Sequence, residues 1–149
     1  MSLKKILLEH CHSYVKDKEQ KLISRYQLLQ DSLNNETKST AGDKHETGRA
    51  MVQLEQEKLE KQERELKFVR QTLQKITIDK TASNASLGSL VVTDDQSYFL
   101  AVFAGAFEDA NGKVFCVSVA SPIGQCLLGK TSGDTLNFNG KAIKILKIE

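Results

Sequence analysis

The sequence has 149 residues, of which 40% are hydrophobic and 6% aromatic, and its formal net charge is +2. This length supplies one ordinary domain or two small ones. The small net charge argues against wholesale nucleic-acid binding, and no apolar stretch approaches the length of a membrane span. The charge is uneven, because residues 1–75 hold 15 basic and 12 acidic side chains and residues 76–149 hold 6 and 7. We therefore expect two units with different roles.

The three cysteines fit a reducing compartment. Their number is odd, their spacing is irregular and no CxxC motif occurs, whereas disulfide frameworks usually have an even number of cysteines. Cys116 and Cys126 are predicted to be core thiols. The apolar run at residues 6–8 is too short for the core of a signal peptide. We expect a cytoplasmic protein without a membrane partner.

Residues 3–33 are predicted to form one long helix. The stretch contains neither Gly nor Pro, and two rows of residues recur at every seventh position. Rows offset by four and three residues make the seam of a coiled coil. The first row is Leu8, Val15, Leu22 and Leu29, and the second is His12, Glu19, Tyr26 and Leu33.

The same pattern predicts a second helix over residues 43–76. The connection between the helices, residues 34–42, consists of turn formers and small polar residues, and it is short enough to return the second helix alongside the first. We predict an antiparallel coiled-coil hairpin over residues 1–78, about 45 Å long at about 1.5 Å per residue, with its tip at residues 41–48. The rows of the second helix are Val52, Leu59, Leu66 and Leu73, and Glu55, Gln62, Val69 and Ile76.

Residues 79–149 are predicted to form a small β-rich domain. A stretch of small residues at 81–89 is expected to be a linker, and strand-like runs rich in Val, Phe, Tyr and Ala follow. Turns are predicted at residues 95–96 and 108–112. The predicted strands are residues 89–93, 97–104 and 113–119.

A short helix and a hairpin complete this domain. Ser121 is predicted to cap the helix, Pro122 to occupy its first position and Gly129 to end it. Asn139-Gly140 is a strong signal for a two-residue hairpin turn. The predicted fold class is therefore α+β, with a helical hairpin followed by a small antiparallel sheet and one short helix.

No motif of a stand-alone enzyme is present. The sequence contains no GxSxG motif and no phosphate-binding loop. His10, Cys11 and His12 are adjacent helical residues that splay over about 200°, so they cannot bind one metal ion together.

Two acids, Asp43 and Glu46, lie three residues apart at the predicted tip of the hairpin. An N-cap acid with Glu three residues later forms a capping box at the start of a helix. Alternatively, the two carboxylates act in chemistry. Mg²⁺ requires near-octahedral oxygen coordination, so an acting pair would have to complete a metal site that another macromolecule supplies. The residues alone leave both interpretations open.

The sequence resembles the bacterial Gre transcript-cleavage factors over nearly its whole length. The tip reads Gly-Asp-x-x-Glu at residues 42–46. Ser-Pro-Ile-Gly at 121–124 is followed by Leu-Leu-Gly-Lys at 127–130 and Gly-Asp at 133–134. The resemblance implies a coiled-coil hairpin joined to an FKBP-like domain that docks on a partner and is not a prolyl isomerase.

The resemblance also implies a function. The FKBP-like domain would dock at the mouth of the secondary channel of RNA polymerase, through the segment of Ser121, Pro122, Ile123 and Gly124. Asp43 and Glu46 would help to hold a second Mg²⁺ in the polymerase active centre, where the polymerase itself cuts backtracked RNA. The chain would be a monomer without enzyme activity or a cofactor of its own, and would meet the RNA 3′ end only indirectly. Basic residues of the second helix would either face this RNA or be solvated surface: Lys58, Lys61, Arg64, Lys67 and Arg70.

Two alternatives remain. Residues 47–50 read Thr-Gly-Arg-Ala, where the Gre family usually has Asn and then an aromatic residue, and the chain start lacks the family's Gly-x-x-Lys-Leu pattern. These departures keep open a secondary-channel regulator of polymerase that does not stimulate cleavage. The second alternative is a coiled-coil interaction module unrelated to polymerase.

Overall fold

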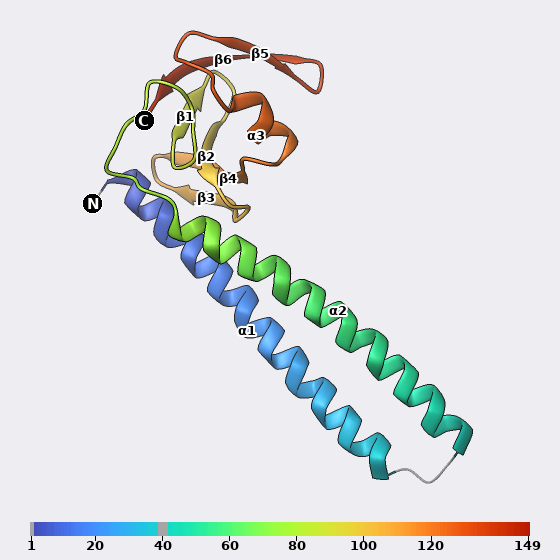
Figure 1. The fold of residues 1–149 in the computed structure, drawn as a ribbon. Coiled ribbons are helices and arrows are strands. Elements are labelled where there is room, and N and C mark those ends of the chain that lie inside the picture. Colours follow the sequence, from blue (N-terminus) through green and yellow to red (C-terminus); the bar gives the residue numbers. More distant parts are fainter. Residues whose placement is uncertain (1, 39–41) are drawn as a thin grey trace. The chain divides into compact units, whose positions relative to one another are not determined.

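The computed structural model describes the backbone of residues 2–38 and 42–149, and the side chains of residues 2–35 and 48–149. Figure 1 shows the elements. In chain order they are α1 (Leu3–Lys38), α2 (Gly42–Gln74), β1 (Leu90–Thr93), β2 (Ser97–Ala101), β3 (Gly105–Asp109), β4 (Gly112–Ser118), α3 (Pro122–Leu127), β5 (Thr135–Phe138) and β6 (Lys141–Ile148).

The chain divides into two compact units, which are described separately. The helical unit is Val15–Arg70, and the sheet unit comprises Met1–Tyr14 and Gln71–Glu149. The sheet unit therefore includes the first turns of α1 and the end of α2. The division into residues 1–78 and 79–149 expected from the sequence stays a prediction.

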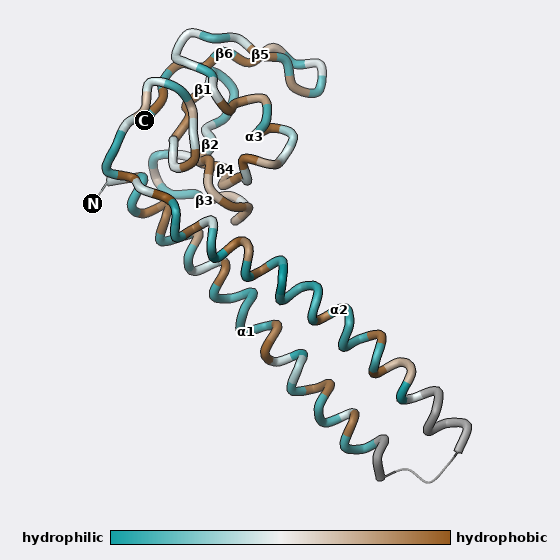
Figure 2. Tube along the Cα trace, viewed as in Figure 1, coloured by the Kyte–Doolittle hydropathy of each residue, from teal (hydrophilic) through white to brown (hydrophobic). Residues whose placement is uncertain are grey.

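The helical unit contains an antiparallel pair of helices with the predicted seam. Leu22, Leu59 and Leu66 are buried along it, and apolar residues recur along both helices with polar residues between them (Figure 2). Polar contacts cross between the helices in one antiparallel register: Arg70 Nη1 lies 3.1 Å from Glu19 Oε2, the Tyr26 hydroxyl donates to Glu63 Oε2 at 3.0 Å, and Arg25 Nη1 donates to Gln62 Oε1 at 3.3 Å.

The bounds of both helices differ from the predicted ones. α1 continues to Lys38 instead of ending near residue 33, and α2 begins at Gly42 and ends at Gln74, two residues before Ile76. Residues 34–38 contain neither Gly nor Pro. Asn and Thr only mildly disfavour a helix interior, so a helix already nucleated can extend through them.

The seam shifts by one position in the first turns of α1, which belong to the sheet unit. Leu7 and Cys11 are buried there, whereas the predicted seam residues Leu8 and His12 are half-buried and exposed. In this segment α1 packs on the sheet as well as beside α2. His10 contacts Phe107, and Tyr14 contacts Phe103. Such packing needs a wider buried face than a strict heptad seam.

The sheet unit contains a six-stranded sheet in the order β3-β4-β2-β1-β6-β5. The α+β class and the long helical region are as predicted, but the sheet is mixed rather than antiparallel, because β2 and β4 pair in parallel. The predicted strand 97–104 ends at Ala101, and a separate strand, β3, begins at Gly105 with φ +65°. β3 forms an antiparallel hairpin with β4 at the sheet edge, so that β4 returns beside β2 in the same direction.

Both faces of the sheet are buried over its central strands. One face packs against α3 in a core that includes Val91, Leu100, Leu127 and Ile145. Strand alternation directs other side chains to the opposite face. Of these, Leu90, Phe99 and Cys116 are at most 2% exposed. On this second face lie the helix ends of the sheet unit, whose buried residues are Leu7, Cys11 and Leu73, and Ile76 is buried just after α2.

The predicted linker at residues 81–89 is built into the sheet unit. Ala85 is buried in the core. Its amide donates to the Lys130 carbonyl at 2.7 Å, and its carbonyl accepts from Gly129 N at 2.7 Å. The small side chains of this stretch therefore allow close packing rather than flexibility. Among the described residues, no helix is long and apolar enough to span a membrane.

Candidate functional site

The predicted tip acids can be placed only by their backbone. Asp43 and Glu46 lie in the first turns of α2, which begins at Gly42. Their side chains, like all those of residues 36–47, lie outside the described part of the chain. The choice between a helix cap and a chemically active pair therefore stays open.

Ser121 has the predicted capping role at the start of α3. Its Oγ accepts a hydrogen bond from Gly124 N at 3.1 Å and donates one to the Ser118 carbonyl at 2.6 Å. Pro122 lies in the first turn, where the missing N–H removes no helical hydrogen bond. Gly129, with φ +83°, follows the helix and lets the chain turn away.

Ile123 and Gly124 lie inside the sheet unit. Ile123 is 8% exposed and belongs to the core below α3. A Cβ added to Gly124 would lie 2.1 Å from the Ser118 carbonyl oxygen and 2.9 Å from Val119 Cα. Glycine is therefore required here for close backbone approach. Of the four predicted docking residues, Pro122 is exposed and Ser121 is half-buried, so these two are the accessible ones.

Replacing Ser121 with Ala is expected to lower the unfolding free energy of the sheet unit by about 1 kcal/mol, within the usual 0.5–2 kcal/mol for a lost cap. Both hydrogen bonds of the hydroxyl are lost together. Urea unfolding monitored by near-ultraviolet circular dichroism measures the change. The Ser83→Ala variant, at an exposed serine, is the matched control. Equal stability of the two variants would contradict the capping role.

The predicted RNA-facing residues do not form a single stripe on α2. Residues spaced by three advance about −60° around a helix at each step, so five of them spiral over about 240°. Arg70 is half-buried and bound to Glu19, whereas the other four are exposed. Only neighbouring members, such as Lys58 and Lys61, share a face.

A groove that sequence reasoning missed lies between the helices of the helical unit. Its volume is about 490 Å³ and its apolar lining residues are Leu22, Leu66 and Val69. Cations of α1 line it, including Lys21, which pairs with Asp17 at 3.2 Å. A seven-residue repeat in the sequence identifies the buried seam. It does not show which charged side chains beside the seam lie close together, so this groove could not be predicted from the sequence.

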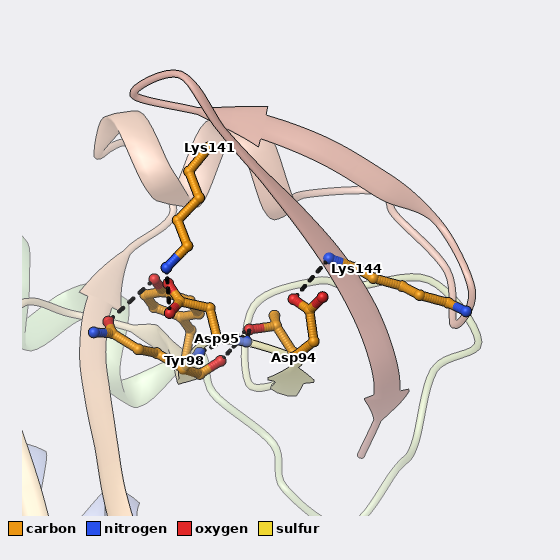
Figure 3. Close-up of polar contacts among 7 residues, drawn as sticks. Asp94, Asp95, Tyr98, Lys141 and Lys144 are labelled. Atoms are coloured by element: carbon orange, nitrogen blue, oxygen red, sulfur yellow. Dashed lines mark hydrogen bonds and ion pairs between the residues drawn. The ribbon is translucent and has the colours of Figure 1, made fainter.

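A second unpredicted group lies in the sheet unit, at the turn between β1 and β2 (Figure 3). The Asp94 carboxylate accepts from Lys144 N at 3.0 Å, and Asp94 N donates to the Lys144 carbonyl at 3.0 Å. Lys141 Nζ lies 2.8 Å from Asp95 Oδ1. These contacts hold the turn on β6, just beyond a register shift between Val92 and Thr93.

The charged and polar groups of this turn have a structural role, because they hold the turn on β6. The hydrogen bond from Lys141 to Asp95 raises the pKa of the lysine. Burial, and then the charge of Asp95, raises the pKa of the Tyr98 phenol, so that the tyrosine stays protonated at neutral pH. Both shifts keep each group in its ordinary protonation state, so the arrangement activates neither an acid nor a base. Nor do the described residues contain a group of three or more His, Cys, Asp or Glu side chains that could hold a metal ion.

Asp134, of the Gly-Asp pair at 133–134, closes a turn before β5. Its Oδ2 accepts from the Thr131 amide at 2.8 Å and the Thr131 hydroxyl at 3.1 Å, and these bonds lower the pKa of the carboxyl group. A lowered folded-state pKa adds stability above the unfolded pKa of about 3.9, and this stability is lost as the pH falls through the folded value.

The Asp134→Asn variant is therefore expected to be less stable than the wild type at pH 7, and this difference should shrink as the pH falls below about 4. Urea unfolding of both proteins at pH 7, 4 and 2.5 measures it. Asp31→Asn, at an exposed position on α1, is the control and should show no such convergence. A stability difference that is independent of pH would contradict the assignment.

The architecture defines a class of protein: a long antiparallel helix pair preceding a small mixed-sheet domain that carries a Ser-capped short helix. Residues 81–149 match the family model described as transcription elongation factor, GreA/GreB, C-term. This match identifies residues 81–149 as a Gre-type domain and supports the predicted assignment of the chain as a Gre-type transcription elongation factor.

One solved structure is similar over most of its length. It is the GreA factor homolog 1 (Gfh1) protein of Thermus thermophilus, at 19% identity and a TM-score of 0.35, covering 95% of this chain and 94% of that one. No curated protein sequence matches the chain.

Proposed function

We propose that this protein binds RNA polymerase in its secondary channel and stimulates the polymerase's own Mg²⁺-dependent cleavage of backtracked RNA. The observation that carries the proposal is the match of residues 81–149 to the GreA/GreB C-terminal family. The antiparallel register of the helical unit supports it, because the backbone of Asp43 and Glu46 then lies in the first turns of the returning helix.

The proposed chemistry is supplied in trans. Asp43 and Glu46 complete the coordination of a Mg²⁺ that is shared with the polymerase and orient the attacking water, and the polymerase cuts the RNA. The factor holds no cofactor of its own and is not itself an enzyme. Its contribution is preorganised negative charge beside a metal ion, in a site where little water screens that charge.

Docking is proposed to use the surface around α3. Because Ile123 and Gly124 are buried, they act by fixing the position of the segment, while Pro122 and the neighbouring exposed Leu128 offer side chains to a partner. Leu128 is 43% exposed. We propose that the factor acts as a cytoplasmic monomer, with neighbouring exposed basic residues of α2, such as Lys58 and Lys61, toward the RNA.

The test is transcript cleavage on stalled, backtracked elongation complexes with the cognate polymerase. The expected result is Mg²⁺-dependent shortening of the RNA from its 3′ end, accelerated by the protein and absent when the protein is incubated with free RNA. If the protein competes with a cleaving factor for the polymerase without shortening RNA, the cleavage proposal is wrong and the chain is a channel regulator. If it does not bind polymerase, the docking proposal fails as well.

A further inference from the structure

Two cysteines far apart in the sequence are buried together in the sheet unit. Cys11 lies in the third turn of α1 and is 0% exposed, and Cys116 lies near the middle of β4 and is 1% exposed. Both are free thiols, and each is the leading influence on the pKa of the other. The sheet unit therefore contains two buried thiols that are close enough to interact.

The contacts around the pair fix this arrangement independently. On the helix side, His10 Nε2 donates to the Ala104 carbonyl at 2.8 Å, and its ring meets Phe107 at a centroid distance of 5.4 Å. On the strand side, Ala104 N donates to the Cys116 carbonyl at 3.2 Å. The residue beside Cys11 is thus bound to the same short loop as the backbone of Cys116.

Neighbouring contacts bracket Cys11 from its other side. The Tyr14 ring, one turn further along α1, lies 5.8 Å from the Phe103 ring. The backbone of Val102 also lies near the Cys11 sulfur and lowers the pKa of this thiol. Because residues 102–104 connect β2 to β3 across the end of β4, all these contacts hold one face of α1 against Cys116.

We propose that Cys11 and Cys116 form a reversible intramolecular disulfide when the protein meets a peroxide, so that the first turns of α1 become covalently joined to β4. Both side chains are buried, and Ala104 joins their surroundings, because its carbonyl accepts from His10 and its amide donates to the Cys116 carbonyl. The third cysteine, Cys126, lies in α3 and packs against the core on the opposite face of the sheet, so it takes no part.

The two thiols have unequal roles. The hydrogen bond from the Cys11 thiol lowers the pKa of Cys116, whereas that bond, together with burial, raises the pKa of Cys11. Cys116 is therefore the sulfur that reacts first, because the thiolate is the nucleophile. Burial of both sulfurs means that the peroxide reacts during brief opening of the first turns of α1.

The reaction balances with hydrogen peroxide as the oxidant. The Cys116 thiolate attacks one peroxide oxygen, an S–O bond forms, the O–O bond breaks, and the departing hydroxide takes up a proton to become water. The Cys11 sulfur then attacks the Cys116 sulfur, the S–S bond forms, the S–O bond breaks, and a second water leaves. Two thiols and one peroxide give one disulfide and two waters, with two electrons passing to the peroxide oxygens.

The disulfide would close a loop of roughly 100 residues and so restrict the unfolded chain strongly. The expected consequence is a rise in the thermal midpoint of the sheet unit by about 10 °C, reversed by a thiol reductant. The bond would keep α1 attached to the sheet during local opening. The switch rests on the sheet unit alone and is independent of the proposed function.

The test treats the full chain with hydrogen peroxide, unfolds it in the presence of N-ethylmaleimide and counts labels by intact mass, followed by peptide mapping. The expected result is one label, on Cys126, and a linked Cys11–Cys116 peptide that disappears after reduction. Three labels after treatment, or a linked peptide that contains Cys126 or a second chain, would overturn the proposal.

Variants separate the pair from the remaining thiol. Cys126→Ser should still form the link and leave no label. Cys116→Ser should keep a label on Cys11, whereas in Cys11→Ser the peroxide should leave Cys116 as a sulfenic acid that takes no label. Neither variant should show a peroxide-dependent rise in thermal midpoint. If either variant fails to fold, the wild-type peptide map together with Cys126→Ser decides the matter, because a link in those two proteins supports the proposal and its absence overturns it.

Discussion

The Asp43→Asn/Glu46→Gln double variant is expected to reduce stimulated cleavage of backtracked RNA by about 100-fold or more. Both changes keep the size of the side chain and remove its negative charge. Losing a single preorganised electrostatic contact in an active centre typically costs about 10²–10³ in rate, and here two are removed at a shared metal ion. Cleavage rates at saturating factor, measured across a range of Mg²⁺ concentrations, give the effect.

A matched control is available on the same helix. Glu57 and Glu60 are also acids three residues apart on α2, and both are exposed. Glu57→Gln/Glu60→Gln should cleave at the wild-type rate and bind polymerase equally well. If the double variant of the tip acids also keeps wild-type cleavage, the two acids are a helix cap, and only a stability change of about 0.5–2 kcal/mol should remain.

The Gly124→Ala variant is expected to destabilise the sheet unit by about 3 kcal/mol. Extra side-chain volume in the core is costly when the neighbouring atoms cannot move to accommodate it. The new methyl group would lie 2.1 Å from the Ser118 carbonyl oxygen, well inside van der Waals contact. The obstacle is backbone rather than a flexible side chain. Relief therefore requires α3 to move away from the end of β4, which would disturb the contact of Ile123 with the core. Urea unfolding followed by near-ultraviolet circular dichroism measures the loss.

Gly129→Ala provides the comparison within the same segment. Gly129 has φ +83° but no atom within 4 Å of an added Cβ, so its replacement costs only the left-handed conformation, about 1–2 kcal/mol. A larger loss for Gly124→Ala than for Gly129→Ala is therefore expected. The reverse order would show that the segment relaxes around position 124 and that close approach is not what requires glycine there.

Local signals predicted the local elements well. Each of the eight seam positions expected on the second helix, from Val52 to Ile76, is buried or half-buried. The Ser121 cap and the hairpin turn at Asn139-Gly140 also occur as predicted, with φ +52° and +78° in the turn. In each case the residues that define the signal are close in sequence and act through the backbone they belong to.

Predictions failed where distant residues decide the outcome. The strand expected over residues 97–104 breaks after Ala101 because the next strand must reach the sheet edge, and no glycine or proline marks the break before Gly105. The ion pair between Asp95 and Lys141 joins residues 46 apart and has no spacing signal. The assignment of Asp43 and Glu46 as chemically active acids is supported only by the sequence, through its resemblance to the Gre family.

The position of β6 has a consequence for how the chain acquires its structure during synthesis. β6 is the last strand described, yet it lies between β1 and β5 inside the sheet. The first turns of α1, which are synthesised before the rest of this unit, belong to the unit that this strand completes. The helical unit can pair as soon as Arg70 has emerged, whereas β1 keeps an open hydrogen-bonding edge until residues 141–148 arrive. A ribosome that stalls before this point would leave an unpaired strand edge exposed, where chaperones or other nascent chains can bind it.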